Sequence, residues 1–446
     1  MDCILDAEKD EKQVFESVTD DIEKALQYAQ SLGATDAEII YSMKRATIIN
    51  FKTDIIETAR CSTNTGYGVR AIINGAVGFS GTNVKSSLLD SVKNAVESAK
   101  VMDPDPYFKS LPEKADYKPI DGLFDEKIIR MTLEECIDKT MDMISSAKEV
   151  AGVEPTSGSF SRSISHLLVM NTNGVFAKKK GTGISGYIDV VAESNLGSES
   201  LATAYDYEVS RSKDIDFAKI GQNAGTLAKK SVKGAHIPTS KLPVIFHSFA
   251  FSDILENTFT LSIDADNVQK ERSGLVGKLN QKIGSEDLSI IDDGTLPGGI
   301  GSGPFDDEGT PTQRTDVIQN GYLKSYLYDS YTAGKDNVKS TGNGYRNSYS
   351  SVPAVDISNL IVQFPQSDIV NETKHALYVH TVIGAHTANE ISGDFSVEGR
   401  NAFIIENGEI TMPVKSVMIS GNIYDMLSKI DGAGLYARKV GNIVTP

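Results

Sequence analysis

The feature that most limits how this chain can fold is an order of segments that occurs twice in its first half. In the first copy, apolar residues recur at helical spacing over residues 19–32 and again over residues 83–102. Alternating runs lie between these two segments, and the Asn74-Gly75 pair within them is a strong hairpin signal. The first copy therefore predicts a helix, an antiparallel sheet and a second helix.

The same order returns further along the chain. A helical segment at residues 132–150 is opened by Thr132 and Glu135, which are spaced as a capping box. A β-rich run follows, and a helical segment at residues 216–231 closes the unit. Residue identity between the two copies is weak, so the prediction of two similar α+β lobes depends on the repeated order of segments.

These patterns divide the chain into four segments. We expect the two helix–antiparallel-sheet–helix lobes at residues 1–102 and 131–235, with a proline-containing connector at residues 103–130. Residues 236–446 contain alternating apolar runs and repeated Asn-Gly pairs, which predict a β-dominated domain with few helices. The predicted fold class is α+β.

Composition and charge exclude several classes of function. The chain has 446 residues, 40% of them hydrophobic and 23% charged, which is typical of a soluble globular protein. Its formal net charge of −16 disfavours binding to nucleic-acid phosphates. No apolar run is long enough for a membrane helix, and the acidic residues 1–15 are unlike a secretory signal. We therefore expect a cytoplasmic protein without a membrane or nucleic-acid partner.

The common catalytic motifs do not form a complete set in this sequence. None of the six histidines belongs to a helical pair beside a glutamate, and neither a G-x-S-x-G elbow nor a P-loop occurs. His380 and His386 would share one face of a strand, and a turn through Gly384 could bring them together as metal ligands. The alternative is that they are ordinary core or surface histidines. We predict no catalytic or metal-binding residue in this chain.

The most unusual segment, residues 296–317, reads LPGGIGSGPFDDEGTPTQRTDV. Its glycine run lacks the final glycine of the dinucleotide fingerprint, so the glycines are expected to allow backbone conformations closed to other residues. The acidic trio Asp306, Asp307 and Glu308 could bind a cation or act as acid and base. The alternative is that these are solvated turn carboxylates, or that one of them pairs with Arg314.

Two blocks of the sequence resemble the TldD/PmbA family. Residues 296–335 are similar to its signature region, in which a glycine run, a P-F-D-x-E-G core, a T-x-R/K step and an N/D-G hairpin follow in order. Residues 391–427 are similar to its C-terminal block, with G-D-F/Y-S, E-N-G-E-I and G-N-I-x-x-M-L elements. The first half matches more loosely, through the order of elements and GYGVRAIINGAVGFSGT, so the resemblance covers essentially the whole chain.

The resemblance implies a cytoplasmic peptidase built from two related subunits, although the family is also named modulator of DNA gyrase. In the TldD type, a helix with H-E-x-x-x-H and a later cysteine hold zinc. The corresponding helix here, residues 254–261, reads ILENTFTL, with Glu256 and Asn257 near the positions of the histidine and glutamate. No histidine follows on that helix and no cysteine follows Cys136. The chain therefore resembles the PmbA type, also called TldE, which lacks the motif and serves as the partner.

These observations give one hypothesis and two alternatives. The hypothesis is a non-metal subunit that pairs with a TldD-like zinc-bearing subunit, as a heterodimer or a larger pseudo-symmetric assembly, to cleave peptides. It needs no cofactor in this chain, because the zinc would belong to the partner. The alternatives are a stand-alone peptidase, using the acidic trio or His380 and His386, and a non-catalytic peptide-binding homodimer.

Under the hypothesis, the glycine-rich loop forms part of the cleft wall. Glycines would let backbone amides approach an extended peptide, as in binding by strand addition, while the charged residues fix the loop or contact the partner. The candidate contact residues are Gly298, Gly299, Gly301, Gly303, Phe305, Asp306, Asp307, Glu308 and Arg314.

Overall fold

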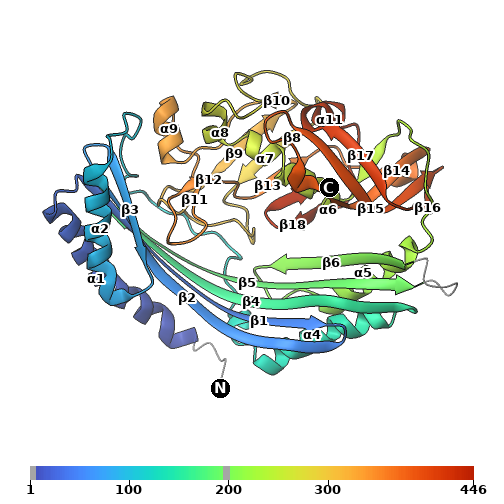
Figure 1. Cartoon of the computed structure of the whole chain (residues 1–446), viewed down its shortest axis with the longest axis horizontal. Coiled ribbons are helices and arrows are strands. Elements are labelled where there is room, and N and C mark those ends of the chain that lie inside the picture. The colour runs from blue at the N-terminus through green and yellow to red at the C-terminus, as the bar shows by residue number, and fades with distance from the viewer. Residues whose placement is uncertain (1–6, 194–200) are drawn as a thin grey trace.

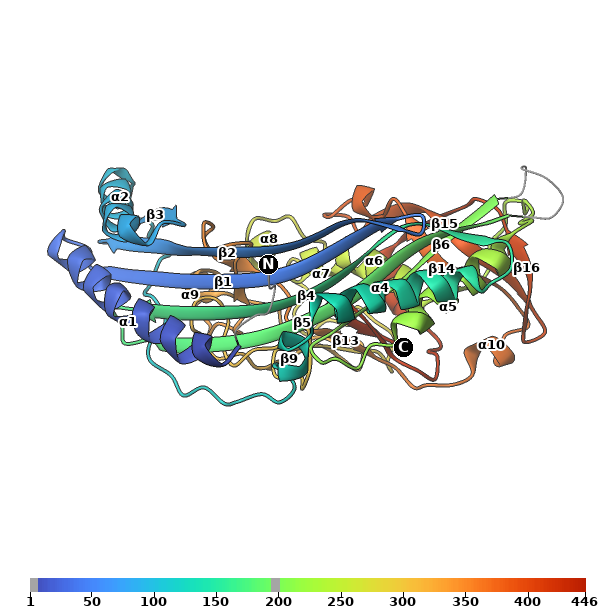
Figure 2. The same ribbon diagram turned by 90° about the horizontal axis from the view of Figure 1, so that it is seen from below.

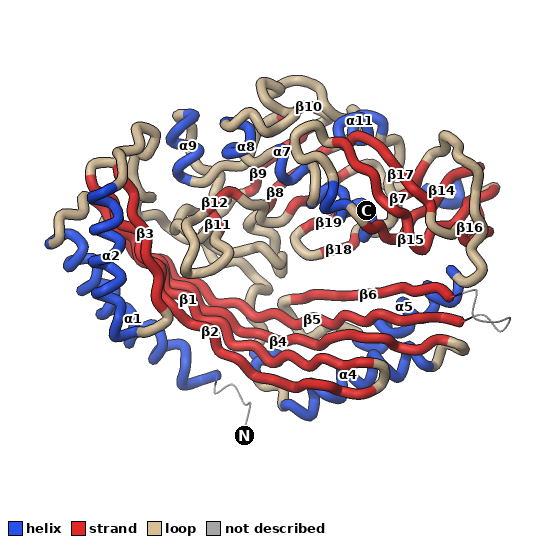
Figure 3. The backbone as a smooth tube through the Cα atoms, viewed as in Figure 1, coloured by secondary structure: helices blue, strands red, loops and turns tan. Residues whose placement is uncertain are grey.

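The computed structural model describes residues 7–193 and 201–446 and arranges them in layers (Figures 1 and 3). A long, curved antiparallel sheet from the N-terminal half carries helices on its convex face, which is turned toward the viewer in Figure 2. The C-terminal half lies over the concave face. This arrangement confirms the predicted α+β class.

In the described residues, the strands of the N-terminal sheet follow the order β3-β2-β1-β4-β5-β6. They are β1 (Asp36–Lys52), β2 (Ile55–Ile73), β3 (Ala76–Thr82), β4 (Val153–Asn171), β5 (Phe176–Glu193) and β6 (Leu201–Ser210). β1 pairs with β4 in antiparallel register from Glu38 opposite Asn171 to Lys52 opposite Ser157. The strands of the two predicted lobes therefore form one continuous sheet, which the order of segments alone does not specify.

The helices of this half agree closely with the helical patterns in the sequence. They are α1 (Ala7–Ser31), η1 (Lys85–Ser87), α2 (Leu88–Val101), α3 (Glu126–Ile129), α4 (Leu133–Lys148) and α5 (Phe217–Ser231). The capping box of Thr132 and Glu135 is present at the start of α4, as predicted. α1 begins earlier than residue 19, because buried Phe15 and Val18 extend its apolar face toward the N-terminus. Within the described residues, no helix combines the length and the apolarity that crossing a membrane requires.

Two hydrophobic cores lie on the convex face of the shared sheet. Because successive strand residues point to opposite faces, odd-numbered residues of β1 face the helices. Ile39 and Met43 pack in the core with α1 and α2, and Ile49 packs in the core with α4 and α5. Ile40 points to the concave face, where it contacts the C-terminal half.

The C-terminal half is strand-rich, as predicted, and its described helices are short. Its sheets have the orders β10-β9-β8-β13-β19-β18 and β16-β15-β14-β7, with β17 also paired to β15 and a separate β11-β12 ribbon. The strands are β7 (Val244–Phe246), β8 (Ser289–Asp293), β9 (Arg314–Gln319), β10 (Tyr322–Leu323), β11 (Gly344–Tyr345), β12 (Ala354–Val355), β13 (Leu360–Gln363), β14 (His375–Ile383), β15 (Asp394–Glu406), β16 (Glu409–Val414), β17 (Val417–Asn422), β18 (Arg438–Val440) and β19 (Ile443–Thr445). The helices are α6 (Ser248–Glu256), α7 (Phe259–Ser262), α8 (Ala265–Gln269), α9 (Ser330–Asp336), α10 (Ile369–Glu372), η2 (Ala385–Thr387) and α11 (Ile423–Lys429). One core joins both larger sheets to α6 through residues such as Ile290, Leu377 and Ile254.

Candidate functional site

The glycine-rich loop packs against the rest of the chain, and each of its four candidate glycines already uses its amide. The donor and acceptor pairs are Gly298 to the Asp121 carbonyl, Gly299 to the Leu296 carbonyl, Gly301 to Asn359 Oδ1 and Gly303 to the Gly294 carbonyl. Strand addition of a peptide along this run would require these hydrogen bonds to break. Contact between these glycines and a peptide or a partner stays a prediction.

The loop needs glycine for close packing within the chain. Gly298 has a φ of +61°, which other residues rarely adopt. A Cβ atom on Gly301 would collide with the carbonyl oxygen of Ser358, at the edge of β13. Backbone freedom, the expected reason for the glycines, therefore holds at Gly298, whereas Gly301 is required because Ser358 leaves no room for a side chain.

Asp306 holds the turn that follows the glycine run. Its side chain is fully buried, and it accepts the backbone N–H groups of Glu308, Thr310 and Gly344 at 2.9–3.0 Å. Burial, together with the charge of Glu308, raises the pKa of Asp306 well above its usual value. The carboxyl group has no exposed surface, so the alternative of a solvated turn carboxylate is wrong for Asp306, which instead stabilises the turn.

Glu308 belongs to a buried ionic cluster between the N-terminal sheet and the C-terminal half. Arg70 of β2 donates from Nη2 to Glu308 Oε1 at 3.0 Å and to Glu38 Oε2 at 2.9 Å, and Glu38 also pairs with Arg346. Burial raises the pKa of Glu308, but the Arg70 charge and the Ser330 hydrogen bonds outweigh burial and lower the pKa overall. The cluster joins residues that lie on β1, on β2 and in the C-terminal half.

Asp307 and Arg314 lie closer to solvent. Asp307 accepts Lys179 Nζ at 3.2 Å and the Arg346 amide at 3.1 Å. Arg314 is exposed on β9 and forms a 3.6 Å ion pair with Asp316. The alternative that Arg314 pairs with the acidic trio is therefore wrong. Arg314 lies on β9 and pairs with Asp316. Asp307 and Glu308 pair with Lys179 and Arg70 instead.

Phe305 anchors the loop to the concave face of the sheet. Its side chain is buried in a cluster with Ile40, Val169 and other residues, and its ring centroid lies 5.0 Å from that of Tyr117. Lys179 Nζ lies 4.9 Å from the centroid of the Phe305 ring. Phe305 therefore contributes to the core between the two layers, and any contact with a substrate or partner stays a prediction.

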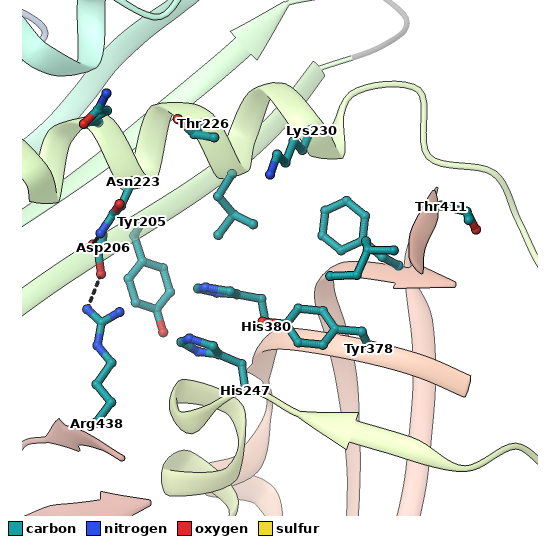
Figure 4. Close-up of a pocket in the computed structure, with 14 residues that line it drawn as sticks. Tyr205, Asp206, Asn223, Thr226, Lys230, His247, Tyr378, His380, Thr411 and Arg438 are labelled. Atoms are coloured by element: carbon teal, nitrogen blue, oxygen red, sulfur yellow. Dashed lines mark hydrogen bonds and ion pairs between the residues drawn. The ribbon is translucent and has the colours of Figure 1, made fainter. Parts of the chain in front are cut away.

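A separate pocket of about 600 Å³ lies between β6 and α5 on one side and the C-terminal strands on the other (Figure 4). Its polar lining includes Tyr205, Asp206, Lys230, His247, His380 and Arg438. Of these residues, the sequence indicates a role only for His380, as a possible metal ligand together with His386. They come from separate segments of the chain, and no motif connects them.

Two stacked histidines form one wall of this pocket. His247 precedes α6, and its ring centroid lies 3.9 Å from that of His380 on β14, with 14° between the ring planes. β7 pairs in parallel with β14, with Phe246 opposite Val379, so the next residue on each strand is a histidine. The register of the two strands therefore creates the stack.

Both imidazoles are neutral at ordinary pH. Burial lowers the pKa of His247 to about 4. Burial, together with the repulsion that a protonated His247 would add, lowers the pKa of His380 well below its usual value. Nδ1 of His247 accepts the Phe249 amide at 3.3 Å, so the proton of the neutral ring lies on Nε2. His247 therefore offers the pocket an uncharged hydrogen-bond donor.

Acid should weaken the fold through His247. The unfolded histidine takes up a proton below about pH 6.5, whereas the folded one does so near pH 4. The stabilisation from His247 is thus present above pH 6.5 and is lost as pH falls toward 4, by up to about 3 kcal/mol. Asn can replace His247 as the helix N-cap without titrating. Urea unfolding at pH 7 and pH 4.5 should show a smaller acid loss for His247→Asn than for the native chain, and equal losses would contradict this account.

The other wall is held by a paired set of polar groups. Arg438 Nη2 donates to Asp206 Oδ1 at 2.6 Å, and Asn223 Nδ2 donates to Asp206 Oδ2 at 2.9 Å. The Arg438 guanidinium also lies over the Phe249 ring, 4.3 Å from its centroid. These contacts tie β18, β6, α5 and α6 together and neutralise the charge of Asp206.

The segment that corresponds to the expected zinc helix is broken. α6 ends at Glu256, and α7 begins at Phe259, so the prediction of one helix over residues 254–261 is wrong. Asn257 causes the break, because its side chain donates back to the carbonyl and Oδ1 of Asp253 and closes the helix end.

Neither proposed set of metal ligands is assembled in the described residues. The α6 segment presents Asp253 and Glu256, and burial raises the pKa of both carboxyl groups. This donor set does not fit the histidine-rich zinc site that the resemblance implies. His380 stacks on His247, while His386 lies in η2, where its charge acts on Asp253. Across residues 7–193 and 201–446, no three His, Cys, Asp or Glu side chains are placed to hold a metal ion together.

Comparison with known proteins finds relatives that match most of the chain. Among curated proteins, an uncharacterized protein of Methanocaldococcus jannaschii is 31% identical over 412 residues, covering 92% of this chain and 94% of the relative. A Buchnera aphidicola protein named metalloprotease PmbA homolog is 30% identical over 279 residues, covering 61% of this chain and 59% of the relative.

Solved structures share the fold. A proposed modulator of a DNA gyrase from Thermotoga maritima superposes with a TM-score of 0.89 at 25% identity, covering 96% of this chain and 97% of that one. TldE from Thermococcus kodakarensis has a TM-score of 0.88 at 23% identity, with the same coverage.

Three family models match successive parts of the chain. They describe PmbA/TldA metallopeptidase domain 1 at residues 37–102, the central domain at residues 126–232 and the C-terminal domain at residues 239–446. Together they cover most of the sequence, and the resemblance seen in the two sequence blocks is confirmed. The chain belongs to the PmbA/TldA metallopeptidase family.

Proposed function

We propose that this chain is the non-metal partner subunit of a cytoplasmic TldD/TldE-type zinc peptidase that acts on peptides. The observation that carries the proposal is the α6 segment, where Glu256 and Asn257 stand near the positions that the resemblance gives to the zinc-binding histidine and its glutamate. Zinc hydrolysis requires three fixed ligands and an activated water. Hydrolysis by this assembly would therefore depend on a TldD-like companion.

The contribution of this chain is a wall of fixed shape. Asp306, Glu308 and Phe305 hold the glycine-rich loop from its buried side, so its outer side keeps one conformation. A preformed wall reduces the entropy lost when an extended peptide is aligned beside a catalytic group. The companion would supply the metal, and the pairing would take the form of a heterodimer or a larger pseudo-symmetric assembly.

Mixing experiments test the proposal directly. The purified chain, a TldD-like chain with H-E-x-x-x-H, and an equimolar mixture would be compared by light scattering, zinc analysis and cleavage of an unstructured reporter peptide. We expect the mixture to form a stable complex that carries a single zinc per pair and cleaves the peptide. The chain alone should carry no stoichiometric zinc and show no cleavage.

A companion with its first motif histidine replaced by alanine serves as the matched control. It should still pair with this chain but lose zinc and peptide cleavage, which separates assembly from chemistry. Stoichiometric zinc or cleavage by the isolated chain would favour the stand-alone peptidase instead. A homodimer that persists unchanged beside the companion would favour the non-catalytic binding protein.

A further inference from the structure

The pocket in Figure 4 contains polar groups that contacts within the described chain leave unsatisfied. The ammonium group of Lys230, in the last turn of α5, has neither an ion pair nor a hydrogen bond to another described residue. Nδ1 of His380 is buried and has no hydrogen-bond partner among the described residues. Figure 4 shows Lys230 on α5, across the pocket from His380 and Tyr378. Lys230 is exposed, so its ammonium is free to pair with an anion, whereas a buried nitrogen such as Nδ1 of His380 normally has a partner and therefore indicates a place for a ligand.

The charge of the pocket selects an anion. Asp206 and Arg438 neutralise each other at 2.6 Å, which leaves the Lys230 charge uncompensated among the lining residues. The whole chain has a formal net charge of −16, so this local positive site differs in sign from the molecule around it. The neutral histidines add hydrogen-bonding groups without adding charge. A single negative group, such as a carboxylate, matches this arrangement.

The rest of the lining selects an apolar group next to that anion. Leu227, Phe403 and Ile410 line the pocket together with the ring of Tyr378. A volume of about 600 Å³ is in the range of pockets that enclose a small organic ligand. Inorganic phosphate or sulfate would leave these apolar walls in contact with water, whereas a hydrophobic side chain would cover them.

We propose that this pocket binds a carboxylate attached to a hydrophobic side chain, as found in the C-terminal residue of a peptide or in a free hydrophobic amino acid. Lys230 pairs with the carboxylate, the stacked histidines supply hydrogen bonds, and Phe403 and Tyr378 enclose the side chain. The site lies in this chain alone. Ligand binding there therefore does not depend on pairing with a zinc-bearing companion.

Calorimetric titration of the full chain tests the proposal with N-acetylphenylalanine and with its C-terminal amide. The acid should bind at least tenfold more tightly than the amide, because the charged contact with Lys230 is lost in the amide. Lys230→Met should weaken binding of the acid by tenfold or more and leave binding of the amide unchanged.

Lys229→Met is the matched control on the same helix. The Lys229 ammonium lies 3.5 Å from the Glu193 carbonyl, and Lys229 does not line the pocket, so this variant should bind the acid normally. Thermal unfolding of both variants would establish that each is folded, and Lys230→Gln would replace any variant that is not. Absence of binding by the native chain, equal affinity for acid and amide, or equal weakening by both substitutions would each overturn the proposal.

Free phenylalanine distinguishes the two sources of the carboxylate. Tighter binding of the N-acetylated acid supports the C-terminus of a peptide, and tighter binding of free phenylalanine supports an amino acid. Failure of every titration would leave the mixing experiment with the companion unaffected, so the two proposals can be judged separately.

Discussion

Replacing Arg70 with methionine should lower the free energy of unfolding by about 3–5 kcal/mol, because a buried carboxylate loses its cation. The side chains of Arg70, Glu38 and Glu308 are 7%, 1% and 0% exposed, and the guanidinium lies between the two carboxylates. Arg346 remains to pair with Glu38, whereas Glu308 keeps only neutral donors from Ser330. Methionine preserves most of the aliphatic packing, so the loss reports mainly on charge.

Urea unfolding followed by circular dichroism measures this effect, since the chain has no tryptophan to serve as a fluorescent probe. Arg314→Met is the matched control. Arg314 and Asp316 are 53% and 44% exposed, and such surface pairs contribute between zero and about 1 kcal/mol. If the two substitutions destabilised the chain equally, the buried cluster would have no special role in joining the layers.

Replacing Phe305 with alanine should cost about 3–5 kcal/mol, as expected when a buried phenylalanine leaves a cavity. Phe305 is 1% exposed and packs on Ile40 and Val169 at the concave face. The cavity would form where the glycine-rich loop meets the sheet. The amides around Asp306 should therefore exchange with deuterium faster than in the native chain, because the loop loses its apolar anchor.

Phe176→Ala makes the same chemical change at a position that is 47% exposed on β5. A surface truncation of this kind should cost less than about 1 kcal/mol and leave the exchange of the loop amides unaltered. Equal losses of stability for the two variants, or unchanged exchange around Asp306 in Phe305→Ala, would show that Phe305 does not anchor the loop.

The acidic trio shows why the sequence could not assign individual roles. Asp306, Asp307 and Glu308 are neighbours in the chain, yet one accepts backbone amides, one pairs with Lys179 and one pairs with Arg70. Adjacent positions in a turn point in different directions, and the partner of each is set by whatever segment packs there. In the sequence the three carboxylates are equivalent, and only long-range packing makes them different.

The lining of the pocket could not be predicted from the sequence for a related reason. His247 and His380 are ordinary residues in their own segments, and they stack because β7 pairs with β14 in one register. A shift of one residue would turn one of the rings to the other face of the sheet. Lys230 and Arg438 likewise reach the pocket from elements that are separate in the sequence.

The sequence by itself determined the helices α4 and α5, the strand-rich second half and membership of the family, because periodicity, capping and motifs depend on residues close together in the chain. Only the tertiary structure decided that both lobes share one sheet, that Arg70 meets Glu308 across 238 residues, and that two histidines form one wall of a pocket. These contacts depend on strand register and on how the layers pack. Local preferences do not fix either of them, because each buried charge or ring is positioned by segments far away in the sequence.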